Sequence, residues 1–205
     1  MKKIAVWLLV VMAVGLVSLL LAIRLLGVPE LNKQPITILA ADGEELGTVY
    51  GDGERIWRSL DQLNPLLVEA TIAIEDQNFY HHGGFDLKRI GGAIVNNIRR
   101  GNLTEGASTI SQQYARNLYL THEKTWTRKI KEAFYTIRLE HHFDKDRLLE
   151  GYLNTIYYGH GIYGVETASQ FFFNKSTTEL TLAEIALLVA IPNRPNANSP
   201  IKHFE

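Results

Sequence analysis

The chain of 205 residues contains no cysteine. It therefore has no disulfide framework, no thiolate nucleophile and no thiolate zinc site, so its chemistry must use oxygen and nitrogen groups. The chain also has almost no net charge, because 21 Lys and Arg residues stand against 22 Asp and Glu residues. This balance gives no indication of nucleic-acid binding. Internal repeats and low-complexity segments are absent as well, and the length is typical of one folded core with an appendage.

Charge is also missing from one long stretch, Ile4 to Ile23, which follows Met1-Lys2-Lys3. Because a membrane-spanning helix needs about 20 apolar residues, residues 1–26 are predicted to form a cytoplasmic tip and an uncleaved single-pass anchor in the cell membrane. The alternative is a cleaved signal peptide, whose apolar core usually has about 7 to 15 residues before a small-residue cleavage site. The two N-terminal lysines favour an extracytoplasmic remainder, although Arg24 reduces the charge asymmetry.

The rest of the chain is expected to be mainly α, with a linker at residues 27–35 and one domain at 36–205. Two strand-like runs in "ITILAADGEELGTVY" meet at Asp42-Gly43, a turn pair that predicts a small N-terminal β-hairpin. Asn64 and Pro65 then begin a helix whose apolar stripe runs out at Glu75. Further helices are expected at about 87–99, 109–117, 126–142, 145–155, 165–173 and 182–190.

The segment "DLKRIGGAIVNNIRRG" is amphipathic. Ile90, Ile94 and Ile98 form an apolar stripe, and basic residues bracket it. A helix that packs on the core and a helix that lies on a membrane surface both explain this pattern. Because an anchor is expected in the same chain, we favour the membrane surface.

The segment "EDQNFYHHGG", residues 75–84, begins with two adjacent acids where an apolar helix ends. An acid pair of this kind is most often a solvated surface feature. Beside apolar neighbours such as Ile72 and Phe79, however, a carboxylate is partly desolvated and suited to accept a proton near neutral pH. A general base at Glu75 is therefore a second interpretation.

The same segment contains two histidines, His81 and His82, with Asp86 shortly after them. Imidazole and carboxylate groups are zinc ligands, so a metal site is one interpretation. Adjacent histidines rarely point at one ion, however, and two glycines follow them. We instead expect His82 to hydrogen-bond within the turn and expect no metal ligands here.

Two further segments are rich in polar side chains. Residues 105–117, "EGASTISQQYARN", offer hydroxyl and amide groups that fit a sugar groove or a phosphate at a helix start, although an ordinary capped helix start explains them too. Residues 124–132, "KTWTRKIKE", place Arg128 and Glu132 one helical turn apart. This arrangement indicates either an exposed ion pair or part of a cation cluster that holds a diphosphate.

Together these segments resemble the family 51 glycosyltransferases, which are the peptidoglycan polymerases of class A penicillin-binding proteins and the monofunctional transglycosylases. The resemblance covers about residues 36–200 and consists of five motifs in order. The first motif, E-D-x-x-F-x-x-H-x-G, matches at residues 75–84. The other four are matched by "GASTISQQ", "RKIKE", "RLLEGYLNTIYYG" and "RPNANSP".

The resemblance implies a lysozyme-like helical fold with a membrane-associated jaw. The implied substrates are lipid II, an undecaprenyl-diphosphate-linked disaccharide-pentapeptide, and the growing glycan strand. Glu75 then corresponds to the general base that takes the proton of the acceptor's 4-hydroxyl, which attacks the anomeric carbon of the donor with inversion. Glu132 corresponds to a second essential carboxylate at the diphosphate.

The motifs also imply contacts and partners. The family needs no tightly bound cofactor, and Mg²⁺ or Mn²⁺ is a candidate stimulating cation. A transpeptidase domain or other cell wall synthesis proteins are the expected partners besides the membrane. The positions implied to contact substrate are Asp76, Phe79, His82, Ser108, Thr109, Gln112, Gln113, Arg116, Lys124, Arg128, Lys129 and Asn154.

The sequence departs from the family pattern in three places. Arg116 and Lys124 stand where many members have Lys and then Arg. The positive charges are kept, but the planar guanidinium and the compact ammonium group exchange places. Asn174 replaces a usual glycine, which requires a left-handed backbone at that residue. The chain also ends at Glu205, soon after the fifth motif, so we expect the C-terminal end of the domain to be truncated.

Two rival functions belong to other classes. A lysozyme-like enzyme that cleaves glycan would also use paired carboxylates, but it does not need the cations Lys124, Arg128 and Lys129. A non-catalytic scaffold that binds lipid II at the membrane does not need both Glu75 and Glu132. The sequence therefore favours polymerisation.

Overall fold

The computed structural model describes residues 7, 10, 11, 14, 15, 17, 18, 21–23, 25–27, 36–42, 45–50, 53–101, 106–120 and 125–201. The chain divides into two compact units, Met1–Glu30 and Leu31–Glu205. In the first unit, most of the described residues are helical. A search of the described residues finds no helix with the length and hydropathy needed to cross a membrane. Much of the expected anchor lies outside these residues.

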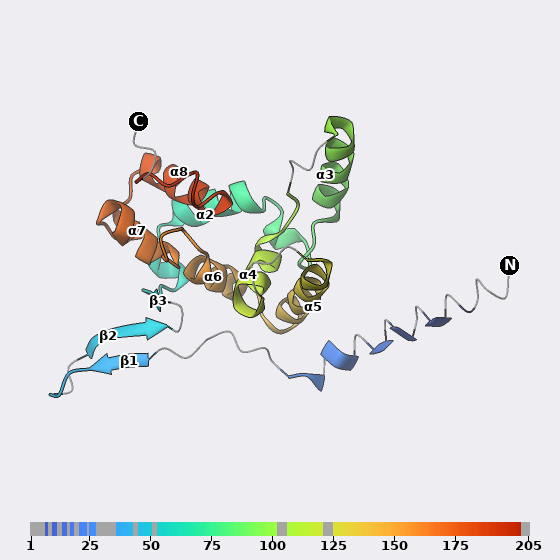
Figure 1. The fold of residues 1–205 in the computed structure, drawn as a ribbon, viewed down its shortest axis with the longest axis horizontal. Helices are drawn as coiled ribbons and strands as arrows, with labels where there is room; N and C mark the ends of the chain where they lie inside the picture. Colours follow the sequence, from blue (N-terminus) through green and yellow to red (C-terminus); the bar gives the residue numbers. More distant parts are fainter. Residues whose placement is uncertain are drawn as a thin grey trace. The chain divides into compact units, whose positions relative to one another are not determined.

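The second unit begins with the expected hairpin, extended by a short third strand. Strands β1 (Ile36–Leu39), β2 (Glu45–Tyr50) and β3 (Gly53–Glu54) form an antiparallel sheet in the order β1-β2-β3 (Figure 1). Ile36 pairs with Val49, and the register shifts between Ile38 and Leu39. In the part of the chain that the structure describes, the regular elements after this sheet are helices, which confirms a mainly helical domain.

The helices of this unit agree with the ranges predicted from the sequence to within about two residues at each end. The described residues also form four short 3₁₀ turns that were not predicted: η1 (Leu60–Gln62), η2 (Phe79–His81), η3 (Thr177–Glu179) and η4 (Ile191–Asn193). The helices are α2 (Pro65–Glu75), α3 (Leu87–Arg100), α4 (Ile110–Tyr119), α5 (Trp126–His142), α6 (Lys145–Thr155), α7 (Val165–Phe173) and α8 (Leu182–Ala190).

Capping side chains explain the helix boundaries. The Asn64 side chain accepts the backbone N–H of Leu66 and Pro65 occupies the first turn, so α2 begins as expected. Thr181 and Glu184 form a capping box at α8. At the end of α7, Asn174 adopts the left-handed conformation with φ 53°, which confirms that asparagine serves in place of the family's glycine.

The core is formed where α4 packs against α5 and α6, and where α2 packs against α8 (Figure 1). Buried side chains from these helices include Leu67, Tyr114, Leu149 and Leu188. The contact of α4 with α6 depends on Gly151, since a Cβ there would lie 2.1 Å from the Tyr114 hydroxyl oxygen. A glycine at this position therefore lets the two helices approach closely.

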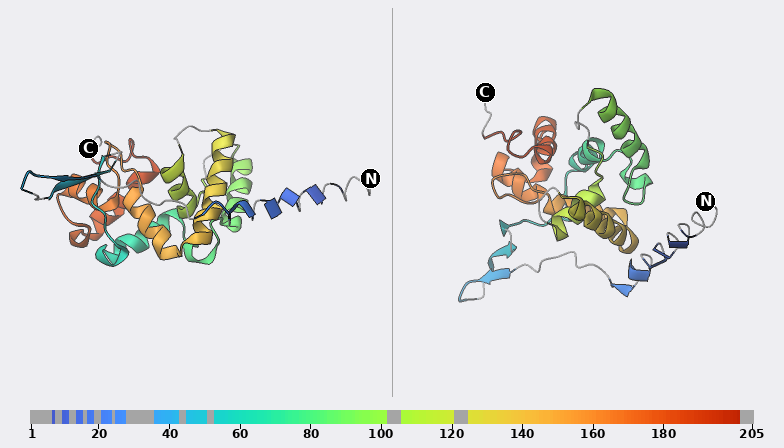
Figure 2. Two further views of the ribbon diagram at one scale, coloured as in Figure 1. Left: turned by 90° about the horizontal axis from the view of Figure 1, so that it is seen from below. Right: turned by 45° about the vertical axis from the view of Figure 1, so that its right-hand side comes forward.

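Helix α3 stands apart from the other helices of this unit (Figure 2). The C-terminal part of its apolar stripe faces outward, because Ile94 is 53 % exposed and Ile98 is 75 % exposed. Ala93 is the residue of this helix that is buried, and Arg99 and Arg100 lie in its last turn. Ile94 and Ile98 therefore do not pack on the core, whereas Ile90 is half-buried.

Candidate active site

Glu75 is the last residue of α2 and is held by two neighbouring helices. Its carboxylate oxygen Oε2 accepts a hydrogen bond from Gln113 Nε2 of α4 at 2.7 Å. Its backbone carbonyl oxygen accepts a hydrogen bond from the guanidinium of Arg89 in α3. The side chain is half-buried. Glu75 thus has one carboxylate oxygen fixed by an amide and keeps contact with solvent.

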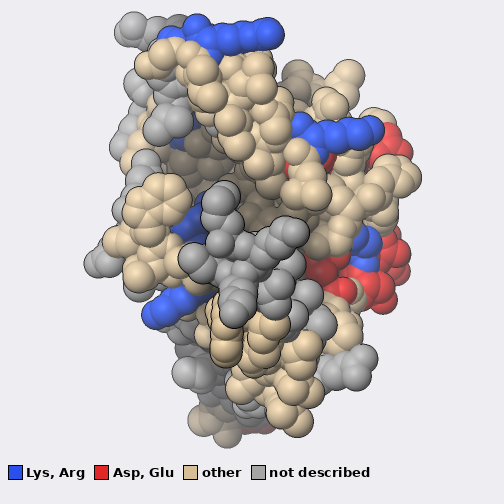
Figure 3. All heavy atoms as spheres, turned by 90° about the vertical axis from the view of Figure 1, so that its right-hand side faces the viewer, with Lys and Arg blue, Asp and Glu red and all other residues tan. Residues whose placement is uncertain are grey.

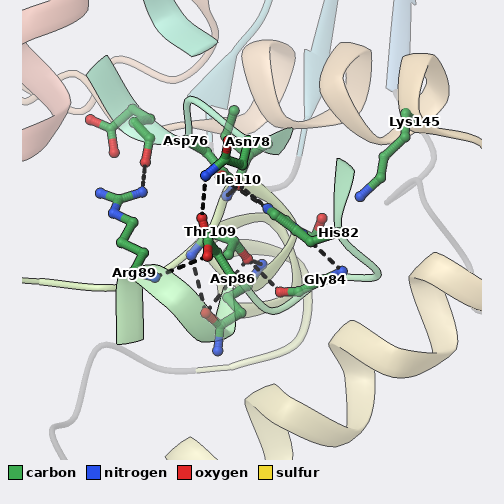
Figure 4. A network of polar contacts seen from close by, with 12 residues as sticks. Asp76, Asn78, His82, Gly84, Asp86, Arg89, Thr109, Ile110 and Lys145 are labelled. Atoms are coloured by element: carbon green, nitrogen blue, oxygen red, sulfur yellow. Dashed lines mark hydrogen bonds and ion pairs between the residues drawn. The ribbon is translucent and has the colours of Figure 1, made fainter. Parts of the chain in front are cut away.

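Asp76 lies next in the chain, is fully buried, and belongs to the network of polar contacts drawn in Figure 4. Its carboxylate accepts the backbone N–H of Ile110 at 3.1 Å and the Nε2–H of His82 at 2.9 Å. The other ring nitrogen of His82, Nδ1, accepts the backbone N–H of Gly84 at 3.2 Å. These bonds fix His82 as the tautomer protonated at Nε2, and they confirm that His82 hydrogen-bonds within the turn.

Thr109 closes this network by joining the turn to α4. Its hydroxyl donates to the backbone carbonyl of Gly84 at 2.6 Å, and its side chain caps α4 in a capping box with Gln112. Gly84 has φ 89°, and a Cβ there would lie 2.8 Å from Thr136 Cγ2. The turn therefore needs glycine for both its backbone angle and its packing.

Asp86 serves as the N-cap of α3. It accepts the backbone N–H of Arg89 at 2.9 Å, which lowers the pKa of this carboxyl group, and it also accepts the side-chain amide of Asn78 at 2.8 Å. His82 is bound to Asp76, and His81 is exposed. Among the described residues, no group of three or more His, Asp or Glu side chains is placed to hold a metal ion.

Glu132 lies in α5 and is fully buried between two cations. Arg128 Nη1 donates to Glu132 Oε2 at 2.7 Å, and Lys129 Nζ donates to Oε1. Lys129 also donates to the Ser108 hydroxyl at 3.3 Å, directly before the cap of α4. The i,i+4 pair predicted from the sequence is confirmed, but its carboxylate is buried, not exposed. The cluster has more positive than negative charge and is attached to the start of α4.

A pocket of about 340 Å³ opens between the end of α2 and the start of α3. Arg89 connects this pocket to the site, because its guanidinium also donates to the Glu75 carbonyl. Gln113 and Lys129 are not among the residues that form its walls, so Arg89 is the link between this pocket and Glu75. The walls are formed by Ala73, Ile74, Gln77, Asn78, Asp86 and Arg89.

Among the residues implied to bind substrate, one group is buried and used within the protein. Phe79 is fully buried in the core. Asn154 is 2 % exposed, and its amide bonds the backbone of Arg58 through both Oδ1 and Nδ2. In this structure these side chains are buried and support the site from within. Their role as substrate contacts stays a prediction. The buried group is Asp76, Phe79, Thr109, Gln112 and Asn154.

The remaining predicted residues are at least partly accessible or lie outside the description. Gln113 and Arg116 lie one turn apart on α4, and both are half-buried. Lys124 lies outside the described residues. The structure thus brings together two networks around α4, one at Glu75 and one at Glu132. The partly accessible group is His82, Ser108, Gln113, Arg116, Arg128 and Lys129.

Two residues of the site were not identified from the sequence. Arg89 contacts the Glu75 carbonyl, and the Tyr152 hydroxyl lies 3.4 Å from Gln113 Oε1. Burial raises the pKa of Tyr152 well above its usual value, and the negative charge of Glu75 raises it further. Tyr152 lies within the fourth motif, which was the available signal, but nothing in the sequence links it to Gln113.

The face shown in Figure 3 is unevenly charged. Lys and Arg side chains lie at its top and on both sides, whereas Asp and Glu side chains gather toward its right edge.

The comparisons with known proteins agree on one family. The sequence model described as Transglycosylase matches residues 42–205. Penicillin-binding protein 2D of Bacillus subtilis is 55 % identical over 89 % of this chain and 27 % of its own length. Penicillin-binding protein 1A of Neisseria cinerea is 42 % identical over 95 % of this chain and 25 % of its own length.

The similarity to a solved structure is weak. A crystal structure of penicillin-binding protein 1A from Haemophilus influenzae aligns with 83 % of this chain and 16 % of that chain, with 24 % identity and a TM-score of 0.39, which is too low to carry an argument. The chain spans about a quarter of the length of the curated relatives. Because the family model matches most of this sequence, residues 42–205, the chain belongs to the transglycosylase family.

Proposed function

We propose that this chain is a peptidoglycan glycosyltransferase that polymerises lipid II into glycan strands during cell wall synthesis. The observation that carries the proposal is the pair of carboxylate networks around α4. One holds a partly accessible carboxylate, Glu75, and the other holds a buried carboxylate, Glu132, between two cations. Family membership and the names of the relatives support the same activity.

Glu75 acts as the general base in this proposal. It takes the proton of the acceptor's 4-hydroxyl while that oxygen forms a bond to the anomeric carbon of the donor, with inversion. The bond from this carbon to the diphosphate oxygen breaks, and undecaprenyl diphosphate leaves with the electron pair. Because Gln113 occupies Oε2, the other carboxylate oxygen, Oε1, is the proton acceptor.

The Glu132 cluster acts on the leaving group. Negative charge develops on the diphosphate oxygens, so cations that are already fixed in place lower the barrier. Arg128 and Lys129 are fixed by Glu132, and Lys129 is further fixed by Ser108. The side chain of Lys129 is 42 % exposed, so it can reach an anion without leaving the cluster. Arg116 and Lys124 are the further cations of this proposal.

The membrane is the proposed location of the reaction. Residues 1–26 serve as a single-pass anchor, and the exposed stripe of α3, with Ile94 and Ile98, lies on the bilayer surface. The basic residues Arg99 and Arg100 at the end of α3 suit anionic lipid headgroups. A transpeptidase domain or other cell wall synthesis proteins are proposed partners, and Mg²⁺ or Mn²⁺ is a proposed stimulating cation.

The test is incubation of the detergent-solubilised chain with labelled lipid II, followed by separation of polymer from monomer. Polymer that grows with time supports the proposal. Shortening of a preformed glycan strand would instead identify a glycan-cleaving enzyme. Binding of lipid II without any turnover would identify a scaffold. A parallel reaction with Glu132→Gln shows whether polymer formation depends on the cation cluster.

A further inference from the structure

The hydrogen bonds of Gln113 depend on which way its side-chain amide points. Nε2 donates to Glu75 Oε2 at 2.7 Å, so Oε1 faces the opposite side. There it meets the hydroxyl of Tyr152 at 3.4 Å. An ionised carboxylate accepts hydrogen bonds only, and an amide oxygen accepts only, so a flipped amide would place two acceptors against each other at Glu75.

Tyr152 is well suited to hold that orientation. It is 1 % exposed, and burial raises the pKa of its phenol above the ordinary value, so the hydroxyl keeps its proton. Among the described residues, Gln113 is the partner of this hydroxyl. A buried hydroxyl needs a hydrogen-bond partner, so Tyr152 donates to Oε1 and leaves Nε2 for Glu75.

We infer that Tyr152 is a positioning residue that sets the Gln113 amide and, through it, the carboxylate of Glu75. The chain of bonds runs from the Tyr152 hydroxyl to Gln113 Oε1, and from Gln113 Nε2 to Glu75 Oε2. Tyr152 itself touches no substrate, because it is buried. This inference rests on the proposed function only in naming Glu75 as the base, since the orientation of Gln113 is a property of the folded protein.

The chain offers a matched control in Tyr158. This tyrosine is also buried, at 2 % exposed, and burial, followed by the negative charge of Glu75, raises the pKa of its phenol as it does for Tyr152. No hydrogen bond joins it to Gln113 among the described residues. Tyr152→Phe and Tyr158→Phe therefore make the same chemical change in similar surroundings, and they differ in the bond to Gln113.

The experiment measures lipid II polymerisation by the full chain in detergent, with Tyr152→Phe, Tyr158→Phe, Gln113→Ala and the double variant Tyr152→Phe/Gln113→Ala. Tyr152→Phe should lower kcat by about 3- to 10-fold with little change in KM, as expected for one neutral hydrogen bond. The acid limb of its pH profile should move to higher pH, because the ionised carboxylate has lost a well-aligned donor. Tyr158→Phe should change neither quantity.

The double variant separates positioning from general damage. If Tyr152 acts through Gln113, adding Tyr152→Phe to Gln113→Ala should cost less than about 2-fold more, since contacting residues are not additive. A full further loss in the double variant, an equal loss in Tyr158→Phe, or no loss in Tyr152→Phe would each overturn the inference.

A measurement that does not depend on enzyme activity tests the inference separately from the proposed function. The side-chain amide resonances of Gln113, assigned by their absence in Gln113→Ala, should shift in Tyr152→Phe and stay in place in Tyr158→Phe. If the parent chain forms no polymer, the proposed function fails, and these resonances alone decide. Unchanged resonances in Tyr152→Phe overturn the inference in that case too.

Discussion

Asp76→Asn tests whether this carboxylate holds the turn of the site together or contacts substrate. The native carboxylate accepts from Ile110 N and from His82 Nε2, and it is fully buried. Asparagine keeps one acceptor, which can serve Ile110. Its NH₂ group must then face His82 Nε2–H, which places two donors against each other.

A change of tautomer at His82 cannot relieve this conflict. If the proton moves from Nε2 to Nδ1, it faces the backbone N–H of Gly84, which donates to Nδ1 in the native protein. One buried donor pair therefore remains in either tautomer. Each lost bond to a buried charged group costs about 1.5 to 3 kcal/mol, so we expect a total loss of about 2 to 4 kcal/mol in the free energy of unfolding.

The measurement is thermal unfolding followed by the helical circular dichroism signal. For a protein of this size, about 2 to 4 °C is lost per kcal/mol, so the melting temperature should fall by about 4 to 16 °C. Asp146→Asn is the control, because this exposed carboxylate accepts one bond from the Tyr80 hydroxyl at 2.9 Å and asparagine can still accept it. The control should stay within about 2 °C of the parent. A melting temperature unchanged in Asp76→Asn, together with lost polymerisation, would refute a structural role for Asp76.

Three further predictions concern the general base, the loss of stability at acidic pH and binding to the membrane. Glu75→Gln should keep the melting temperature, since an amide can still bond Gln113, and should lower polymerisation by about 10²- to 10⁴-fold; more than about a tenth of the parent rate would show that Glu75 is not the base. Lys175 lowers the pKa of Glu184 to about 2, below its ordinary value of 4.5, so the stabilisation from this pair is present above pH 4.5 and is lost as the pH falls toward 2. Melting curves of Glu184→Gln should therefore fall less steeply than those of the parent between these pH values, and parallel curves would contradict the assignment. Ile94→Asp should weaken co-sedimentation of the chain without residues 1–26 with anionic liposomes at low salt, provided that circular dichroism first shows this shortened chain to be folded; equal binding by both forms would exclude α3 from the membrane surface.

The positions of the helices could be predicted from the sequence because they depend on local interactions. Asn64 and Pro65 begin α2, and Thr181 with Glu184 begins α8, through bonds within one helical turn. The amphipathic pattern of α3 was equally visible, but the sequence left open which partner its stripe faces. The exposure of Ile94 and Ile98 excluded the core.

The motifs identified the family, and the tertiary structure sorted their residues by accessibility. Asp76 and Asn154 share motifs with accessible residues, yet they are buried and bonded to backbone groups. The bond between Glu75 and Gln113 joins residues 38 positions apart, and the bond between Tyr152 and Gln113 joins residues 39 apart. Pairings of this kind depend on how α2, α4 and α6 pack, because helix periodicity and capping reach only about one turn along the chain. For this reason the sequence alone determined the helices and the family, and only the packing of the helices decided that Glu75 is half-buried against Gln113 and that Glu132 is fully buried.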